Sequence, residues 1–578
     1  MYTIQENVRI VIATLKAYNI RHVVISPGGT NIPVSQAMQD DPFFQCYSVP
    51  DERSAMYFAI GLHLQTGEII ATSCTSAQAT RNYIPGLTEA FYKHTPVLAI
   101  TTAKLERFQY QDYMQAPDQC SLPKDAVKRS FDLPPVRDNN TRIQCQHAAI
   151  EAILELTHHG SGPVQLNIRI DDTENGKFED MELPAIKPIK RYTAWDKWDD
   201  IELGNRKVLI VMGECRDFTK EQQDAIELFC ESHNATVYAN NLSNYHGKYS
   251  IQANLLVSCT TGSYFKAKLS PEILITIGGQ TGDYSIFGKL NNNPYMEHWR
   301  ISEDGNVVNT YNCLTKIFEC PPSYFFRKLK KDKPAEHIYF QEWNTANTLL
   351  KENVEIPFSN LYAAQQLYQL LPKNSYVNFA ILNSLRCWGY FKLDPSIKCF
   401  SNVAAFGIDG GTSTLIGESM NTGNMCFMIT GDLAFFYDMN SLGIRHIKKN
   451  LRILLINNNG GAEFRIMTGN WKERIETGHY ISAEGHNGNA KGWAENCGFT
   501  YLSAKTKEEF QNNKDLFIGE SDKPVLFEIF TQPKDEKEAN ESFISSNKID
   551  NMEGSLKSIV KNALGEQTVR RIKQIINK

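Results

Sequence analysis

Two short segments in the last third of the sequence carry the oxygen groups that a divalent cation needs. Gly431-Asp432 follows an apolar run at 426–429, and Asn457-Asn458-Asn459-Gly460-Gly461 follows another at 453–456. Mg2+ binds oxygen ligands in octahedral geometry, and a carboxylate, an amide carbonyl and a backbone carbonyl supply them. Gly-Asp and Asn-Gly are also common turn pairs. The prediction of an Mg2+-diphosphate site therefore depends on the order and spacing of the two segments, with glycines that let the backbone come close.

The elements around these segments explain how they could meet. We predict strands at 426–429 and 453–456, joined by a helix at 437–448, which together make a βαβ unit. A right-handed crossover places both strand ends on one edge of the sheet. Asp432 and Asn458, 26 positions apart in the sequence, would then converge on one point.

A second candidate for chemistry lies near the N-terminus, in Val49-Pro50-Asp51-Glu52-Arg53. One interpretation is structural: Asp51 caps a helix and Glu52 interacts favourably with the helix dipole. The other interpretation is that Glu52 is a catalytic acid. These residues alone favour neither.

Strands and helices alternate through the first third of the chain. We predict strands at 23–26 and 69–74 and a helix at 77–92. Such alternation is typical of a parallel, doubly wound sheet. These sheets bind ligands at the carboxyl ends of their strands, which here are Ser26-Pro27-Gly28 and Cys74-Thr75-Ser76.

Polar stretches at 171–200 and 327–336 divide the chain. Between them, a second α/β unit begins with a strand at 208–212 and closes with a strand at 273–278. A third unit begins near Pro357 and contains a strand at 376–379. The predicted fold class is α/β, with three consecutive doubly wound parallel-sheet domains at 1–185, 186–345 and 346–578.

The bulk properties argue against several classes of protein. A net charge of -5 over 578 residues gives no electrostatic basis for binding nucleic acid or an anionic membrane. No apolar run approaches the roughly 20 residues that span a bilayer, and the N-terminal segment lacks the pattern of a signal peptide. Thirteen scattered cysteines indicate reduced thiols in a cytoplasmic protein. Residues 556–578 predict a basic amphipathic helix, docked or solvated, with membrane-surface binding as the alternative.

The segment from Gly431-Asp432 to Asn458 resembles the binding signature of thiamine diphosphate (ThDP) enzymes. The resemblance implies ThDP and Mg2+ as cofactors, with Asp432, Asn458 and the carbonyl of Gly460 as metal ligands. Which of the three asparagines binds the metal is uncertain by one position. The resemblance also implies pyrimidine-binding, middle and diphosphate-binding domains. Glu52 would then activate a cofactor bound by a partner subunit, in a homodimer or homotetramer with active sites at the subunit interface.

A closer resemblance is to the SEPHCHC synthase family of menaquinone biosynthesis. It rests on Ser26-Pro27-Gly28, residues 51–55, 82–85 and 115–119, Asn383-Ser384, Ser401-Asn402 and residues 407–410. Members of that family decarboxylate 2-oxoglutarate on ThDP and add the resulting unit to isochorismate. By this resemblance the cofactor-binding residues would be Asn383, Ser384, Gly407, Ile408, Gly431, Asp432, Leu433, Ala434, Asn458, Gly460 and Gly461.

The sequence departs from that family at residues expected to hold substrate carboxylates. Thr30 and Val403 stand where the family has arginines, Arg386 matches a third arginine only loosely, and residues 281–289 have no clear Lys-Arg pair. Arginine binds carboxylate through two charge-assisted hydrogen bonds. Losing one buried partner of such a pair costs about 2–5 kcal/mol. We therefore predict a relative with a different substrate, which Thr30, Asn31 and Arg386 would face.

Glu463 is a second departure, because the family has an apolar residue at this position. A glutamate desolvated beside the cofactor could act as a general acid or base; the alternative is a solvent-facing residue at a turn. By resemblance to a Gln-Ala motif, Gln115 is the remaining catalytic candidate.

The predicted function is that of a ThDP- and Mg2+-dependent 2-oxoacid decarboxylase or carboligase. It would form a C2-carbanion/enamine intermediate and transfer it to an acceptor that the sequence does not identify. One alternative is SEPHCHC synthase itself, and another is a catalytically silent ThDP-fold binding subunit. In the middle domain, the glycine-rich turn at 277–282 is only a weak nucleotide-binding motif.

Overall fold

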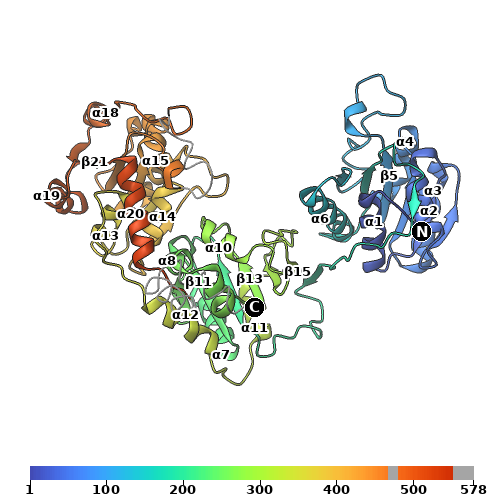
Figure 1. The fold of residues 1–578 in the computed structure, drawn as a ribbon, viewed down its shortest axis with the longest axis horizontal. Helices are drawn as coiled ribbons and strands as arrows, with labels where there is room; N and C mark the ends of the chain where they lie inside the picture. The colour runs from blue at the N-terminus through green and yellow to red at the C-terminus, as the bar shows by residue number, and fades with distance from the viewer. Residues whose placement is uncertain (467–478, 551–578) are drawn as a thin grey trace, which may run out of the picture. The chain divides into compact units, whose positions relative to one another are not determined.

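The computed structural model describes residues 1–466 and 479–550. By their internal contacts these form two compact units, Met1–Arg191 with Thr315–Ile317, and Tyr192–Leu314 with the chain from Phe318 onward. Within each unit, parallel strands alternate with helices that pack on the sheets (Figure 1), which confirms the predicted α/β class. The domain boundaries at 185/186 and 345/346 remain predictions.

The sheet of the first unit has the strand order β3-β2-β4-β5-β7-β6, and its pairings are parallel. The order reverses between β2 (His22–Ile25) and β4 (Ile70–Cys74). The carboxyl ends of these two strands therefore flank the crevice where doubly wound sheets bind ligands. The remaining elements are β3 (Gln45–Ser48), β5 (Val97–Ala103), β6 (Ser130–Leu133), β7 (Val164–Arg169), α1 (Glu6–Ala17), α2 (Ile32–Gln39), α3 (Glu52–Thr66) and α6 (Asn139–Glu155).

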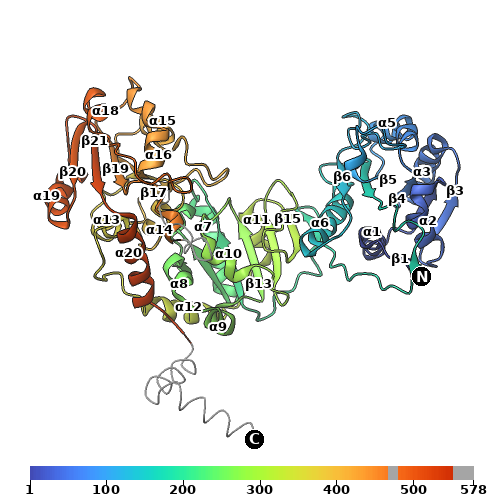
Figure 2. The same cartoon turned by 45° about the horizontal axis from the view of Figure 1, so that its top comes forward.

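The last sheet, in the second unit, repeats this connectivity. Its order is β17-β16-β18-β19-β21-β20, so both sheets read 2-1-3-4-6-5 when their strands are numbered along the chain. Here the order reverses between β16 (Tyr376–Phe379) and β18 (Cys426–Gly431), and β19 (Leu451–Asn457) lies next to β18. The other elements are β17 (Lys398–Phe400), β20 (Thr500–Ala504), β21 (Val525–Phe530), α13 (Asn360–Leu367), α14 (Asn383–Gly389), α15 (Gly411–Glu418), α18 (Lys491–Asn496), α19 (Lys507–Ile518) and α20 (Pro533–Ser546). Figure 2 shows α20 beside α13, and the two helices are in contact.

The middle sheet has a different order, β12-β11-β10-β13-β14-β15-β9. It reverses between β10 (Val208–Met212) and β13 (Ile273–Ile277). The prediction that this sheet closes at 273–278 is wrong, because β14 and β15 extend it. The other elements are β9 (Lys190–Thr193), β11 (Ala235–Ala239), β12 (Ser250–Gln252), β14 (Glu297–Ile301), β15 (Leu314–Glu319), α7 (Lys220–Ser232), α8 (Asn254–Cys259), α10 (Tyr284–Leu290), α11 (Pro322–Leu329) and α12 (Ile338–Thr348).

The predicted helix at 77–92 is two helices. α4 (Gln78–Asn82) and α5 (Ile84–Tyr92) are separated at Tyr83. Pro85 lies in the first turn of α5, where its missing N–H is tolerated, whereas it would break a continuous helix.

The prediction of a helix at 437–448 is wrong. α16 (Asp432–Tyr437) begins directly at Asp432 instead, and a short 3-10 turn at Met439–Gly443 follows it. Asp438 lies between them and directs its carboxylate to the N–H and hydroxyl of Ser413, both at 2.7 Å. The predicted amphipathic helix at 556–578 lies outside the described residues.

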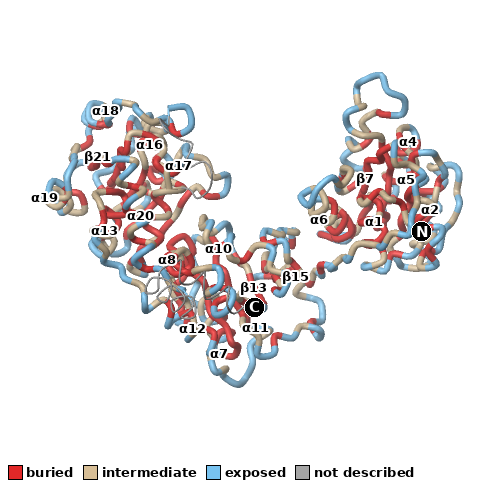
Figure 3. The backbone as a smooth tube through the Cα atoms, in the orientation of Figure 1, coloured by how far each residue is buried: buried red, intermediate tan, exposed pale blue. Residues whose placement is uncertain are grey.

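The central strands of each sheet are the most buried parts of the backbone (Figure 3), whereas the edge strand β3 is largely exposed. β19 is buried along its whole length, as expected for a strand with helices on both faces of its sheet. In the described part of the chain, no helix has both the length and the apolar composition that crossing a bilayer requires.

Candidate active site

The carboxyl ends of adjacent strands bring the metal-ligand candidates together. Gly431, at the end of β18, pairs with Ile456 near the end of β19. Asp432 begins α16 directly after β18, and the asparagine-glycine turn follows β19. The two segments meet as predicted, because the N–H of Gly460 donates a hydrogen bond to Oδ2 of Asp432 at 2.9 Å.

Asp432 is a buried carboxylate, with 1% of its surface exposed. Its Oδ1 accepts a hydrogen bond from the N–H of Leu433 at 2.7 Å, and Nε2 of His486 lies 3.1 Å from Oδ2. Burial raises the pKa of this carboxyl, and the hydrogen bonds from Gly460 and His486 oppose the rise. A divalent cation would offset the desolvation of such a carboxylate, so the residue fits a ligand of Mg2+.

The three asparagines of the turn have different surroundings. Asn457 is engaged by its neighbours, since its Nδ2 donates to Glu528 at 2.7 Å and to the carbonyl of Gly488 at 2.9 Å. The side-chain oxygens of Asn458 and Asn459 are buried and have no hydrogen-bond partner among the described residues. A buried, unpaired amide oxygen is unfavourable, and a cation would satisfy it. The donor set therefore fits Mg2+ at Asn458 or Asn459 and argues against Asn457.

A segment that the sequence analysis did not single out completes this region. Arg465 binds Glu484 through two hydrogen bonds, at 2.8 and 2.6 Å, and His486 follows on the same segment. Gly460 (φ +146°) packs against this segment so closely that a Cβ would lie 2.8 Å from the Cα of Glu484. His486 is 54 positions from Asp432, and the only signal in the sequence is the run of glycine and asparagine around it.

Several cofactor-contact candidates line one hollow at the crevice between β16 and β18. Gly407, Ile408 and Ala434 line it together with Thr430. The other candidates in this part of the chain, Gly431, Leu433 and Gly461, are chain neighbours of Asp432 and Gly460. The structure thus gathers these predicted residues at the carboxyl edge of the third sheet.

Asn383 and Ser384 begin α14 and are held by a buried glutamate of α20. Glu536 accepts hydrogen bonds from Nδ2 of Asn383 at 3.1 Å and from the N–H of Asn360 at 2.9 Å. Asn360 in turn donates to Oγ of Ser384 at 3.3 Å. Burial raises the pKa of Glu536 to about 6, against the effect of these bonds. The sequence analysis missed Glu536, because its environment depends on segments more than a hundred residues apart.

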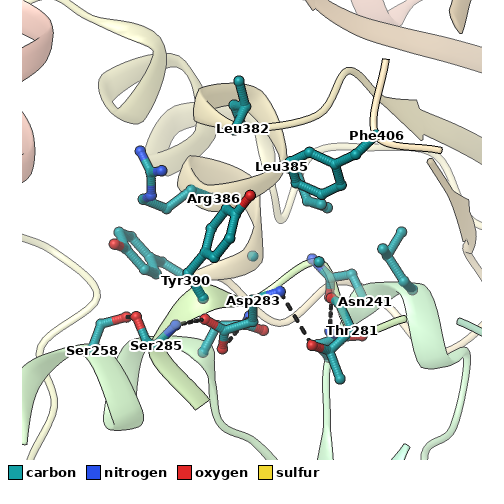
Figure 4. A pocket seen from close by; sticks show the side chains of 16 residues that line it. Asn241, Ser258, Thr281, Asp283, Ser285, Leu382, Leu385, Arg386, Tyr390 and Phe406 are labelled. Carbon is teal, nitrogen blue, oxygen red and sulfur yellow. Dashed lines mark hydrogen bonds between the residues drawn. The ribbon is translucent and has the colours of Figure 1, made fainter. Parts of the chain in front are cut away.

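Arg386, predicted to face the substrate, forms an ion pair with Glu463, the predicted general acid or base. Nη1 of Arg386 lies 2.8 Å from Oε2 of Glu463, and Nη2 bonds the other oxygen. Their side chains are 24% and 10% exposed. In Figure 4, Arg386 and Tyr390 border a pocket, with Asp283 on the opposite side from the guanidinium. The charge of Arg386 is therefore already neutralised within the chain.

In the first unit, Glu52 begins α3 and Asp51 caps it, because Oδ1 of Asp51 accepts from the N–H of Arg53 at 3.1 Å. Oε2 of Glu52 accepts from Nδ2 of Asn82 at 3.4 Å. Burial, with a smaller contribution from the charge of Glu52, raises the pKa of Cys74 to about 12. Glu52 thus opens the helix that follows β3, with Cys74 at the end of β4 close enough to feel its charge. Its role as the activating acid stays a prediction.

The loop after β2 packs directly on the loop after β4. A Cβ added to Gly28 would lie 2.3 Å from Cβ of Thr75. Thr30 is 2% exposed, and its hydroxyl lies 3.1 Å from that of Ser76. Asn31 is fully buried, donates to the carbonyl of Ser26 at 3.2 Å and accepts from Ser73 at 2.7 Å.

These contacts assign Thr30 and Asn31 to holding the two loops together within the described part of the first unit. Their contact with the substrate stays a prediction. Gln115 is different, because it is exposed, has a φ of +57° and lines a surface cavity with Phe108 and Tyr113. It remains a catalytic or substrate-binding candidate.

Comparison with known proteins supports these geometric observations. Residues 6–122 match the family model described as thiamine pyrophosphate enzyme, N-terminal TPP binding domain. The chain is 33% identical over 550 residues to a protein of Phocaeicola vulgatus named 2-succinyl-5-enolpyruvyl-6-hydroxy-3-cyclohexene-1-carboxylate (SEPHCHC) synthase, covering 92% of this chain and 96% of that one. It is 32% identical over 551 residues to the protein of that name from Bacteroides thetaiotaomicron, covering 92% and 97%. A relative of the same name from Flavobacterium johnsoniae is 29% identical over 545 residues, covering 90% and 95%.

The matched domain, the repeated sheet connectivity and the buried oxygen ligands define the chain as a thiamine-diphosphate-dependent enzyme that uses Mg2+. The alternative of a catalytically silent subunit is thereby set aside. More specifically, the chain belongs to the SEPHCHC synthase family, since its likeness to that family runs over nine-tenths of its length.

Proposed function

We propose that this chain is a carboligase that decarboxylates a 2-oxoacid and transfers the remaining unit to an acceptor. We further propose that its substrates differ from 2-oxoglutarate and isochorismate. ThDP, when bound, supplies a nucleophilic carbon and an electron sink for the decarboxylation. The buried ion pair between Arg386 and Glu463 carries the proposal of a different substrate.

The roles of the chain's own groups begin with the cation. Asp432, one of the two unpaired asparagine oxygens and the carbonyl of Gly460 would hold Mg2+ against the diphosphate. Gly407, Ile408 and Ala434 would border the cofactor in the hollow between β16 and β18. Glu536 would fix Asn383 and Ser384 for their contact with it.

Glu52 would accept the hydrogen bond of the cofactor's aminopyrimidine and promote its proton transfer. The residue is partly exposed at the edge of its sheet, and its single hydrogen bond from Asn82 is long at 3.4 Å. A carboxylate that is held loosely can exchange that bond for a cofactor bond. Gln115 would contact the substrate from the exposed loop of the same unit.

The ion pair supports a substrate without a carboxylate at this position. A free arginine recognises carboxylate through two parallel hydrogen bonds. Both oxygens of Glu463 already occupy these donors of Arg386. Thr30 and Val403, both buried, offer no charge in place of the family's other two arginines. Glu463 thus orients and neutralises Arg386, while direct proton transfer by Glu463 remains a prediction.

The deciding experiment is a panel of 2-oxoacids, including pyruvate, 2-oxobutyrate and 2-oxoglutarate, scored for CO2 release with ThDP and Mg2+. We expect an uncharged side chain to be preferred, and Glu52→Gln to reduce turnover by about 100-fold or more. If none of the acids releases CO2, the proposed carboligase activity is wrong. Retention of full activity in Glu52→Gln would exclude Glu52 as the residue that activates the cofactor.

SEPHCHC synthase is the second candidate, favoured by the names of the relatives. Incubation with 2-oxoglutarate and isochorismate distinguishes it. Formation of SEPHCHC with the highest kcat/KM of the panel would establish this candidate and refute the proposal of a different substrate.

We also propose that the active site is shared between two copies of the chain. Glu52 and Asp432 lie in different compact units. The resemblance to ThDP enzymes implies that each cofactor is held by one subunit and activated by the other. This proposal requires a homodimer or a homotetramer, and we propose separately that the enzyme is cytoplasmic.

A further inference from the structure

A buried glutamine of the first unit joins the loop after β4 to the loop after β5. Gln119 lies four residues after Gln115, near the end of the loop that follows β5, and 2% of its surface is exposed. Its Oε1 accepts a hydrogen bond from the N–H of Ala77, in the loop that follows β4, at 2.9 Å. Neither the metal site nor the proposed substrate contacts account for this buried side chain.

The neighbours of Gln119 determine which way its amide points. Its Nε2 donates to the carbonyl of Thr102 at 3.0 Å and to Oδ1 of Asn167 at 2.9 Å. Asn167 is oriented in turn, because its Nδ2 donates at 2.6 Å to the carboxylate of Asp132, which is ion-paired with the buried Arg169 and can only accept. Both N–H groups of the Gln119 amide are thus used, so its oxygen is directed at the loop after β4.

Ala77 has a backbone conformation that alanine adopts only when its surroundings impose it. Its φ of +66° and ψ of -115° lie in a region that favours glycine. The residue stands directly before α4, so its conformation sets the direction in which α4 leaves the strand. The hydrogen bond from its N–H to Gln119 opposes relaxation of this conformation. Arg81 of α4 adds a second contact, from Nη2 to the carbonyl of Asp118 at 3.0 Å.

The last residue of α4 contacts the candidate acid. Nδ2 of Asn82 donates to Oε2 of Glu52 at 3.4 Å. A change in the direction of α4 would withdraw this donor from the carboxylate. Gln115, which has a φ of +57°, would shift with its own loop, because Gln119 anchors the end of that loop. One buried amide therefore holds two candidate groups of the proposed site in place.

We propose that Gln119 is a positioning residue of the carboligase. It holds Ala77 in its strained conformation and thereby fixes α4 and the donor that α4 offers to Glu52. The proposal rests on the proposed function, because it requires that Glu52 activates the cofactor. The site needs one acceptor and two donors on one side chain, which an amide supplies.

The test compares Gln119→Met with the matched control Gln5→Met, since methionine keeps the length of the side chain and removes its hydrogen bonds. Gln5 is also a buried glutamine of the first unit, 3% exposed, but its side-chain hydrogen bonds go to the backbone of Asp171 instead of to either loop. Deuterium exchange of backbone amides is measured by mass spectrometry in the full-length protein without cofactor. We expect peptides covering 75–83 to exchange about tenfold or more faster in Gln119→Met, and at the wild-type rate in Gln5→Met.

A second measurement follows the bound cofactor without any substrate. In the full-length protein loaded with ThDP and Mg2+, we expect exchange of the C2 proton of ThDP with solvent deuterium to slow about fivefold or more in Gln119→Met. NMR after acid quench measures this rate. Adding Ala77→Gly to that variant should restore most of the rate, because glycine adopts the conformation without strain. A purely structural role of Gln119 predicts neither this rescue nor a difference from Gln5→Met.

Urea denaturation verifies that the variants are folded. If Gln119→Met does not fold, Gln119→Asn, which keeps the amide but withdraws it from Ala77, replaces it under the same criteria. Wild-type amide exchange at 75–83 in the Gln119 variant would overturn the proposal. So would equal slowing of C2 exchange in the Gln119 and Gln5 variants.

Failure of the proposed function gives a different pattern. Unchanged C2 exchange in Glu52→Gln would refute the role of Glu52 and, with it, the positioning role of Gln119. Absence of CO2 release from every 2-oxoacid, with C2 exchange slowed in both variants, would refute the carboligase reaction and still support Gln119 as the residue that positions the activating acid.

Discussion

Asn458 and Asn459 offer the same unpaired oxygen but differ in backbone conformation. Asn459 has a φ of +66°, a left-handed conformation that asparagine tolerates better than alanine does. We expect Asn458→Ala to remove a ligand of Mg2+ and to weaken its apparent affinity by at least about tenfold. Asn459→Ala should instead lower stability with little change in Mg2+ affinity.

Titration of Mg2+ in the presence of ThDP, followed by intrinsic tryptophan fluorescence, measures the first effect, and urea denaturation measures the second. A larger loss of Mg2+ affinity in Asn459→Ala would transfer the ligand role to that residue.

The Arg386–Glu463 pair makes a prediction about specificity. Glu463→Gln removes the negative charge and frees guanidinium donors of Arg386. We expect the ratio of kcat/KM for 2-oxoglutarate over pyruvate to rise about tenfold or more, since a charged hydrogen bond contributes about 1.5–3 kcal/mol.

The control is the double variant Glu463→Gln, Arg386→Met, in which the gain should disappear. The same gain in both variants would show that Arg386 does not contact the distal carboxylate.

At the scale of elements, Glu536 joins α20 to the first residues of α13 and α14. Burial raises its pKa to about 6, above the 4.5 of an ordinary glutamate. The folded state therefore binds this proton more tightly than the unfolded state, so its stabilising effect is complete below pH 4.5 and is lost as pH rises through 6. Glu536→Gln cannot titrate.

We expect the free energy of unfolding of the parent protein, relative to Glu536→Gln, to fall by about 2 kcal/mol across this range. Urea denaturation of both proteins at several pH values measures the difference. A difference that does not change with pH would contradict the assigned pKa.

How far the sequence predicts these elements depends on the range of the contacts that define them. The strands at 208–212 and 376–379 agree with β10 and β16 because continuous apolar runs mark buried parallel strands. The prediction of a helix at 437–448 is wrong because Asp438 accepts a hydrogen bond from Ser413, which is remote in the chain. Likewise, the spacing of Asp432 and Asn458 after two apolar strands was enough to predict that they meet. The contacts of Glu536 and His486 and the pairing of Arg386 with Glu463 join segments that are remote in the sequence, so no local pattern predicts them.

At the scale of the whole molecule, the proposed sharing of the active site can be tested by complementation. Glu52→Gln and Asp432→Asn each remove one half of the site and should be inactive alone. If the halves come from different subunits, random mixing into dimers should restore about a quarter of the wild-type sites. Steady-state activity after co-refolding or co-expression of the two variants measures the recovery. No recovery, despite mixed dimers detected by differential tagging, would place Glu52 and Asp432 of one chain in the same site.

The parallel pairing of the strands also has a consequence for how the chain acquires its structure. Parallel neighbours cannot be joined by a tight hairpin, so each pairing in the first and third sheets requires closure of a long crossover segment. Such non-local contacts form late and slowly. In the meantime the apolar strands, β19 above all, are exposed to other chains at the same stage. Refolding from denaturant should therefore be slow, and its yield should fall as protein concentration rises, because intermolecular association of these strands competes with the crossover closures.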